Sequence, residues 1–307
     1  RKTSKLKITH FPKINSIKKT KEATEQNPDF NIQLQQSNTL DQSFLHSLRE
    51  KDNFEDFSKF FTPTLYKSLS KLPDREYCRP SLSVTLEDHI LYDILSERKK
   101  LLVIDLVDTL IRVRSESYND SVIEEVISEL ETYYTLNVDS AQLKIQLRPG
   151  LLNFLNRVKA FYHIVVFTSS SKNYAEPILD FIDEKKNIFS MRLYQNYCTK
   201  IANNTESFYL KDLRVFTDLN KFAGKVICVD DDVMTFGYNL DNGVPILNFS
   251  SNPNCYNLND DDELLCLGKF LDDMAEVEDV RKEIAVRRKT EFEEKLNSIS
   301  KIVDFLK

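Results

Sequence analysis

The sequence predicts an α/β protein whose parallel sheet is covered by helices on both faces. Three runs of apolar residues, at 100–105, 162–167 and 225–230, are short and uninterrupted, as is typical of strands buried in a parallel sheet. Segments with apolar residues at helical spacing lie between these runs. Buried strands that alternate with helices pair in parallel through crossover connections, so helices are expected on both sides of the sheet.

The beginning of the chain predicts an extended basic arm. Residues 1–38 are polar, show no sustained apolar period and contain no acidic residue before Glu22. Such a segment cannot bury enough surface to offset its ordering entropy. An arm that docks on an acidic partner, the remnant of an organelle-targeting segment and a disordered tail all fit this composition. Because residue 1 is arginine and not methionine, we expect the sequence to be part of a longer polypeptide.

Residues 39–90 predict a helical docking segment. Between residues 45 and 69, apolar side chains recur at roughly helical spacing, and Pro63 after Thr62 marks the start of a second short helix. We expect these two short helices to pack on the main domain or on a partner. Residues 86–99 then lead into the first buried strand.

The main domain is expected at 91–275. Besides the three buried strands, it contains predicted helices at 122–134, 151–161 and 173–182 and predicted strands at 142–147, 191–194 and 244–247.

Residues 276–307 predict a C-terminal amphipathic helix. They contain no Gly or Pro, and Val277, Val280 and Ile284 share an apolar face that resumes between 296 and 306. This stripe needs a partner surface, either the helices of residues 39–72 or another chain. We expect other protein subunits to bind through residues 1–72 and 276–307, and removal of these segments to spare the fold of the main domain.

Composition restricts the partners and the compartment. The net charge of -6 at pH 7 does not favour nucleic acid as a partner. The five cysteines are odd in number and include no Cys-x-x-Cys pair, which argues against a disulfide framework and a zinc site and favours a reducing, intracellular compartment. Cytoplasm, cytoskeleton, nucleus and an organelle all stay open. No run approaches the roughly 18 apolar residues of a membrane span, and no signal-peptide core is visible.

Polar side chains at the ends of the three buried strands predict a phosphoryl-transfer site. The strands end in Asp105, in Thr168 and in Asp230 followed by Asp231, and Lys211 precedes the last strand. The carboxyl ends of parallel strands meet in the crevice where open α/β sheets bind ligands. Phosphoryl transfer needs a nucleophile, a hydroxyl for phosphate oxygens, a cation and carboxylates for a divalent metal. Taken singly, each residue also fits an ordinary loop cap, a surface lysine or a solvated acidic loop.

A series of short motifs between residues 99 and 274 carries a family resemblance. The motifs are Val103–Asp105, Thr109–Leu110, Arg148–Gly150, Val165–Ser169, Tyr174–Pro177, Arg192–Tyr194, Cys198–Thr199, Lys211–Leu213, Val229–Asp231 and Asn242–Pro245. With these motifs the chain resembles the CTD-phosphatase and small CTD phosphatase family, also called NLI-interacting-factor-like, of the haloacid dehalogenase superfamily. The resemblance implies a haloacid dehalogenase-like fold and activity on phosphoserine or phosphothreonine proteins.

The resemblance also implies roles for single residues. Asp105 would be the nucleophile, Thr168 would bind the transferring phosphoryl group and Lys211 would neutralise its charge. Mg²⁺ would be held by Asp105, by Asp231 and by the backbone carbonyl of Val107.

The chain departs from the family at the position of the general acid and base. The family reads Asp-x-Asp-x-Thr, whereas here the residues are Asp105, Leu106, Val107, Asp108 and Thr109. Val107 can offer its carbonyl to a metal, but it cannot protonate a leaving group or activate water, and such help is typically worth about 10²–10⁴-fold per step. Asp108 is expected to point in a different direction from residue 107, which argues against it as a substitute.

Three functions stay open. Val107 favours a pseudophosphatase that serves as a structural or interaction subunit of a larger assembly. The retention of Asp105, Thr168, Lys211 and Asp231 favours an active Mg²⁺-dependent protein phosphatase with an unusual acid and base. A phosphopeptide-binding module without turnover would use the same four residues.

Overall fold

The computed structural model describes most of the main domain and the adjoining parts of both flanks. The described residues are 57, 60–76, 78–115, 133–138, 141–202, 207–249 and 261–288. The basic arm at 1–38, the first short helix of 39–72, most of the predicted helix 122–134 and the chain after Arg288 lie outside the described residues. Within the described ranges, no helix combines the length and the apolar character needed to cross a bilayer.

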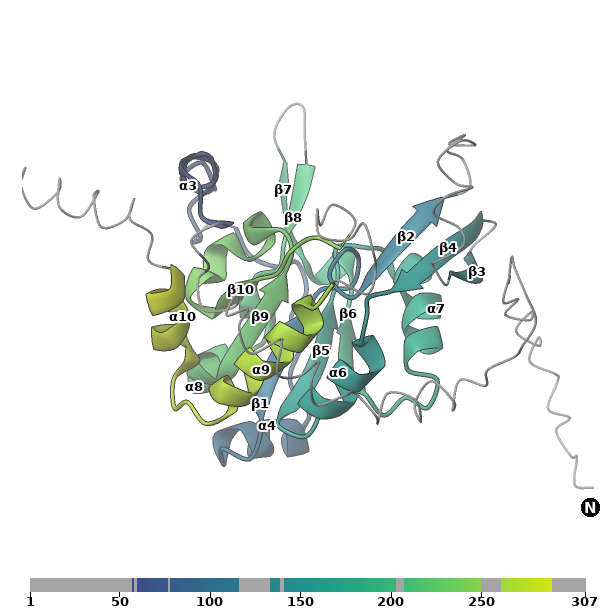
Figure 1. The fold of residues 1–307 in the computed structure, drawn as a ribbon. Helices are drawn as coiled ribbons and strands as arrows, with labels where there is room; N and C mark the ends of the chain where they lie inside the picture. The colour runs from purple at the N-terminus through teal and green to yellow at the C-terminus, as the bar shows by residue number, and fades with distance from the viewer. Residues whose placement is uncertain are drawn as a thin grey trace, which may run out of the picture.

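A five-stranded parallel sheet forms the centre of the molecule (Figure 1). In the order β10-β9-β1-β5-β6, its strands are β10 (Gly243–Pro245), β9 (Val226–Asp230), β1 (Lys100–Ile104), β5 (Tyr162–Phe167) and β6 (Phe189–Leu193). Every residue of β1, β5 and β9 is buried, as their uninterrupted apolar runs predicted. Ile104 lies opposite Val166 of β5 and Val229 of β9, so the three strands end at the same level.

Helices connect and cover the strands. They are α4 (Asp88–Leu95), α6 (Leu151–Val158), α7 (Lys172–Ile182), α8 (Leu219–Phe222) and α9 (Glu263–Ala275), with 3-10 turns η4 (Gln195–Tyr197), η5 (Leu213–Val215), η6 (Ala223–Lys225) and η7 (Val233–Asn242). In Figure 1, α6 and α9 lie side by side across the sheet, and α4 packs against β1 and α8. The prediction of a parallel sheet with helices on both faces is confirmed.

Helix α6 illustrates how the sequence sets these elements. Leu151, Phe154, Leu155 and Val158 are its buried residues, and their spacing puts them on one face. The helix begins after Gly150, whose φ of 73° lies in the left-handed region that glycine enters without a steric penalty. The expected helix 151–161 therefore has the right start but ends three residues earlier.

A second, antiparallel sheet was only partly predicted. It consists of β2 (Ile111–Ser115), β4 (Ala141–Leu147) and β3 (Tyr134–Val138) in that order, and Figure 1 shows it beside the central sheet. The predicted strand 142–147 lies in β4, outside the parallel sheet. The prediction of a helix at 122–134 is wrong at its C-terminal end, because Tyr134 begins β3 and pairs with Ile145 of β4. Aromatic and β-branched residues at 134–138 favour a strand, and this pairing decides the outcome.

The hairpin of β7 (Thr199–Ala202) and β8 (Ser207–Leu210) was not predicted either. It rises from the carboxyl edge of the central sheet in Figure 1. Its four-residue strands are too short to give a clear alternating pattern in the sequence.

Side chains from both flanks pack into the core of the domain. Phe57 and Phe61 are buried, and so are Val280 and Ile284 of α10 (Val280–Arg288). Phe57 donates its N–H to the carbonyl of Arg287 at 3.1 Å, so the two flanks meet. Removing residues 1–72 or 276–307 would take these buried side chains out of the core, so we now expect loss of these parts to destabilise the fold.

The N-terminal flank continues into α3 (Pro63–Leu69). Thr62 caps this helix with its hydroxyl, which accepts the N–H of Leu65 at 3.2 Å, and Pro63 occupies the first turn. This agrees with the predicted helix start at Pro63.

Two substitutions on α10 test the packing of the C-terminal flank. Ile284→Ala is expected to lower the free energy of unfolding by about 2–5 kcal/mol, because it leaves a cavity at a fully buried site. Val286→Ala, on the same helix but 60% exposed, is the control and should change it by less than about 0.5 kcal/mol. Urea denaturation measures both, and equal effects of the two substitutions would contradict the packing of α10 on the domain.

Candidate active site

The carboxyl edge of the central sheet brings the predicted site residues together. Asp105 and Thr168 follow β1 and β5 directly, and Asp230 is the last residue of β9. Their backbones continue the pairing of the sheet: Asp105 donates its N–H to the carbonyl of Val229 at 3.0 Å, and Thr168 donates to Leu193 at 2.9 Å. The strand ends thus hold these side chains on rigid elements at one edge, where open α/β sheets bind ligands.

Lys211 supplies the cation at this edge. It follows β8, and its Nζ lies 2.5 Å from Asp105 Oδ1 and 2.5 Å from Asp230 Oδ2. All three side chains are almost completely buried. Charges buried in a region of low dielectric are tolerated when they are paired and hydrogen-bonded, so the ammonium group and the two carboxylates depend on one another.

The electrostatics of the site follow from this packing. Burial, reinforced by the charge of Asp230, raises the pKa of Asp105 to about 7 against the opposing effect of Lys211. Burial alone would lower the pKa of Lys211, but the charges of Asp105 and Asp230 outweigh it and raise that pKa above its usual value. Lys211 therefore remains a cation at neutral pH.

The acidic loop after β9 contributes a third carboxylate. Asp231 accepts hydrogen bonds from Thr109 Oγ1 at 3.0 Å and from Asn248 Nδ2 at 2.7 Å. Burial and the charge of Asp230 raise the pKa of Asp231 to about 6. Asp232 instead caps η7, because its Oδ1 accepts the N–H of Met234 at 2.9 Å.

Three of these carboxylates could hold a metal ion. Asp105, Asp230 and Asp231 each offer one oxygen, and the three oxygens lie within 4.8 Å of one another. Hard oxygen donors of this kind suit Mg²⁺, which is usually bound through one or two carboxylates. The sequence had singled out Asp105 and Asp231 together with the carbonyl of Val107. The structure adds Asp230, whose position is fixed by Lys211 and by the N–H of Asp232, 3.0 Å from its Oδ1.

Thr168 places a hydroxyl at the start of the loop after β5. Its Oγ1 accepts the N–H of Ser170 at 3.1 Å, and the side chain is buried. Accepting this bond uses a lone pair of the hydroxyl, so its proton can be donated to a ligand oxygen.

Val107 and Asp108 form the turn between Asp105 and β2. Val107 is partly buried against the apolar core. Asp108 has a φ of 64°, its N–H donates to Ile111 at 2.7 Å, and its carbonyl accepts the N–H of Phe249 at 2.7 Å. These main-chain bonds fix the turn, so the side chain of Asp108 cannot take the direction of residue 107 without breaking them.

Arg148 is a supporting residue that the sequence marked only as part of a motif. It is buried, and its Nε donates to Asp261 Oδ1 at 3.0 Å. Its Nη1 donates to the carbonyl of Thr109 at 3.0 Å, and its Nη2 donates to that of Leu247 at 2.8 Å. One planar guanidinium group therefore ties together three loops around the site, a use that suits its fixed fork of donors.

Comparison with known proteins gives the family. The sequence model of the family of NLI interacting factor-like phosphatases matches residues 100–281, which is more than half of the chain. The chain belongs to this family. The resemblance to the haloacid dehalogenase superfamily seen in the sequence is thereby confirmed.

Two relatives can each be aligned with more than half of the chain. CTD small phosphatase-like protein 3 of Caenorhabditis elegans is 33% identical over 172 residues, which are 56% of this chain and 53% of that protein. Nuclear envelope morphology protein 1 of Schizosaccharomyces pombe is 26% identical over 257 residues, which are 79% of this chain and 50% of that protein. The chain thus spans about half the length of these two relatives.

The chain is also similar to a solved structure, that of Fcp1, an essential RNA polymerase II CTD phosphatase. The TM-score is 0.41 and the sequence identity is 19%. The similarity covers 53% of this chain and 45% of that chain.

The raised pKa values predict how Mg²⁺ binding depends on pH. Protonated carboxyl groups do not bind Mg²⁺, and the pKa values are about 7 for Asp105 and about 6 for Asp231. As the pH rises from roughly 5 to roughly 8, the affinity should therefore increase and then level off. The increase should be up to about a hundredfold per pH unit below the pKa of Asp231, where both carboxyl groups are protonated, and about tenfold per unit between the two pKa values. Calorimetric titration with MgCl₂ measures this, and an affinity independent of pH would contradict the assignment of the three carboxylates. Asp218→Asn is the control, because Asp218 pairs with Lys221 and is not one of the three carboxylates. Its Mg²⁺ affinity should depend on pH as that of the wild type does.

Proposed function

We propose that the chain is a magnesium-binding pseudophosphatase: a phosphatase-type domain that still accepts a phosphoryl group at Asp105 but does not turn it over, and that serves as an interaction subunit of a larger assembly. The observation that carries the proposal is Val107. It stands two residues after Asp105, where the family has its general acid and base.

The capacity to bind a phosphoryl group is supported by the side chains that remain. The Asp105 carboxylate is the nucleophile of the proposal, and Lys211 lies 2.5 Å from it, where it can neutralise the charge of the incoming group. The buried Thr168 hydroxyl can donate to a phosphoryl oxygen. Mg²⁺ bound at Asp105, Asp230 and Asp231 would neutralise further charge on the phosphoryl oxygens.

The loss of turnover follows from what an aliphatic side chain cannot do. Transfer from phosphoserine or phosphothreonine to Asp105 breaks the bond between phosphorus and the alkoxide oxygen, and that alkoxide must be protonated as it leaves. Hydrolysis of the aspartyl-phosphate then requires a base to take a proton from the attacking water. Val107 can do neither, and each step would lose about 10²–10⁴-fold in rate.

An active phosphatase would need another carboxylate in this role, and Asp108 is the nearest one in sequence. Its main chain is held on both sides by hydrogen bonds to Ile111 and Phe249. Its charge acts on α7, because burial and the charge of Asp108 together raise the pKa of Tyr174. These observations support the loss of turnover over an unusual acid and base.

Partner binding is the part of the proposal that depends on the flanks. The basic arm at 1–38 carries lysines without nearby acids before Glu22, which suits an acidic protein surface. A phosphoprotein would bind at the crevice itself, and the scattered cysteines support a reducing, intracellular compartment. In this reading, subunits bind through residues 1–72 and 276–307, outside the parts that pack into the core.

Hydrolysis of para-nitrophenyl phosphate with Mg²⁺ tests the proposal. The natural chain should show negligible turnover but should form an aspartyl-phosphate, because the nitrophenolate leaving group needs little protonation. Val107→Asp should raise turnover by about 10²-fold or more, since it returns a carboxylate to the acid and base position. Acid-quench mass spectrometry detects the acyl-phosphate, and colorimetry measures turnover.

Matched variants separate the possible outcomes. Asp105→Asn combined with Val107→Asp should be inactive, and Val107→Asn, of similar size to the aspartate variant but without a carboxylate, should stay at the level of the natural chain. Release of phosphate from a phosphoserine peptide by the natural chain at an ordinary enzymatic rate would overturn the pseudophosphatase.

A further inference from the structure

The main chain of Lys211 is held on both sides by η7. Its N–H donates to the carbonyl of Thr235 at 2.6 Å, and its carbonyl accepts Nδ2 of Asn239 at 3.2 Å. Asn239 is buried and has a φ of -134°, outside the helical range of its neighbours. The ammonium group of Lys211 is paired with Asp105 and Asp230, and the hydrogen bonds of its peptide fix the point from which the side chain reaches them.

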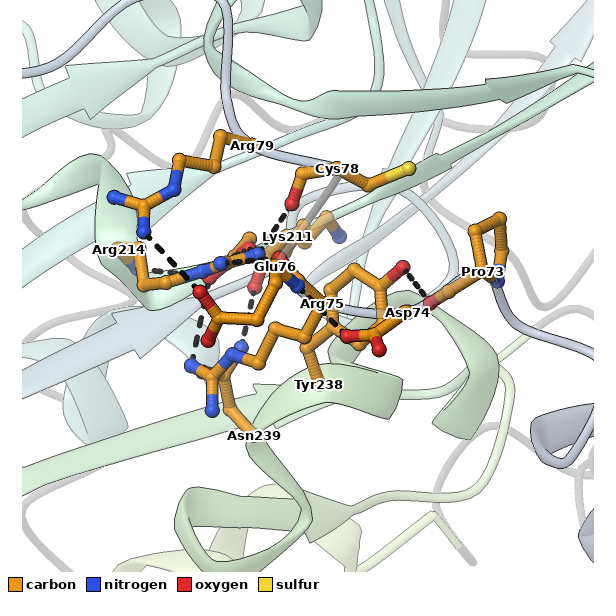
Figure 2. Close-up of polar contacts among 11 residues, drawn as sticks. Pro73, Asp74, Arg75, Glu76, Cys78, Arg79, Lys211, Arg214, Tyr238 and Asn239 are labelled. Atoms are coloured by element: carbon orange, nitrogen blue, oxygen red, sulfur yellow. Dashed lines mark hydrogen bonds and ion pairs between the residues drawn. The ribbon is translucent and has the colours of Figure 1, made fainter.

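The N-terminal flank contacts Asn239 through Arg75. Figure 2 shows Arg75 reaching Asn239, and its Nη2 donates to Asn239 Oδ1 at 3.0 Å. Arg75 also lies 3.8 Å from the carboxylate of the buried Asp212, the residue after Lys211. The flank thus touches both neighbours of the Lys211 peptide, η7 on one side and Asp212 on the other.

Arg214 fixes the flank in this position. Its Nε donates to Asp212 Oδ2 at 2.8 Å, and its Nη1 donates to the main-chain carbonyl of Arg75 at 2.6 Å. A further bond from Arg214 reaches the carbonyl of Cys78, and the hydroxyl of Tyr238 donates to the carbonyl of Pro73 at 2.7 Å. Figure 2 shows these contacts around residues 73–79.

The chemistry of the guanidinium group gives the contact between Arg75 and Asn239 a direction. A guanidinium group has only donors, so Arg75 can face only the oxygen of the Asn239 amide. The NH₂ of that amide must then face the carbonyl of Lys211, where it is needed as a donor. Without Arg75, the Asn239 amide loses the partner that fixes its oxygen, so the side chain is held less firmly against the carbonyl of Lys211.

We propose that Arg75 and Asn239 are positioning residues that hold Lys211 in place, so that the affinity of the site for a phosphoryl group depends on the N-terminal flank. This inference rests on the proposed phosphoryl binding at Asp105. Coupling between two sites is reciprocal, so a partner that moves residues 73–79 weakens phosphoryl binding, and a bound phosphoryl group opposes that partner.

Binding of beryllium fluoride, a mimic of the phosphoryl group on an aspartate, tests the coupling in the full chain with saturating Mg²⁺. Arg75→Ala should weaken it by about tenfold, the scale at which residues outside a site change coupling. Arg75→Lys should recover most of the affinity, because an ammonium group is also only a donor. Asn239→Asp should bind beryllium fluoride as weakly as Arg75→Ala does, because a carboxylate cannot donate a hydrogen bond to the carbonyl of Lys211. Calorimetry measures these affinities and the affinity for Mg²⁺ alone. The Arg75 variants should not weaken Mg²⁺ binding, because a displaced Lys211 competes less for Asp105 and Asp230.

Arg79→Ala is the matched control, since Arg79 lies in the same segment, is 66% exposed and pairs only loosely with Glu76 at 3.9 Å. Its affinity for beryllium fluoride should equal that of the wild type. Amide hydrogen exchange gives a second readout that needs no ligand: Arg75→Ala should speed exchange at the N–H of Lys211, and Arg79→Ala should not.

Equal beryllium fluoride affinity in the wild type and in Arg75→Ala overturns the inference. So does an equal loss of affinity for Mg²⁺ alone, which indicates a general loosening of the site. A wild type that binds no beryllium fluoride refutes the proposed function, and the exchange rate at Lys211 then still decides whether Arg75 positions it.

Discussion

Lys211 holds its ammonium group 2.5 Å from the carboxylates of both Asp105 and Asp230 in a part of the protein from which water is almost excluded. Neither carboxylate is tolerable there without the cation, and the cation is not tolerable without them. Asp105 lies about a hundred residues before the other two in the sequence, and Lys211 and Asp230 are 19 residues apart. The parallel sheet aligns two of them through its strand ends, and η7 and the loop after β8 deliver the third.

The site and its scaffold are joined by a small number of polar groups that each serve several loops. Arg148 donates hydrogen bonds to the carbonyls of Thr109 and Leu247 and to the carboxylate of Asp261. Asp231 accepts hydrogen bonds from the side chains of Thr109 and Asn248. Such shared partners make the loops interdependent, so a change in one is felt by the others. Val107 stands in the midst of this network, where its side chain packs on the core and its main chain forms a β-bridge with Ile111. In the proposed function, the exchange of one side chain thus separates binding from turnover while the surrounding contacts stay in place.

The sequence was informative wherever a local pattern determines the structure. Uninterrupted apolar runs identified β1, β5 and β9, and the acids and the threonine at their ends predicted where Asp105, Thr168 and Asp230 would meet. The antiparallel sheet was harder to recognise, because the alternation of Ile111, Arg112 and Val113 in β2 spans only a few residues. Nothing in it indicates that Arg112 is buried and pairs with Gln146 of β4. The helix expected to end at 134 failed since the pairing of β3 with β4 is a tertiary effect.

Other features had no signal in the sequence. Arg75 and Asn239 are 164 residues apart, and nothing in either neighbourhood indicates that they meet. The ion pair between Asp230 and Lys211 also depends on three-dimensional packing, although the sequence placed Asp230 at the site. Contacts of this kind depend on how distant loops pack, whereas patterns of hydrophobicity report only on local structure.

The meeting of Phe57 with Phe270 and with the main chain of Arg287 has a consequence for biosynthesis. A ribosome makes the chain from its N-terminus, so Phe57 is translated long before the helices that cover it exist. Until α9 and α10 emerge, Phe57 lacks the ring of Phe270 and the main chain of Arg287 that it contacts in the finished domain. The nascent domain therefore keeps apolar surface exposed until its last described helix is made.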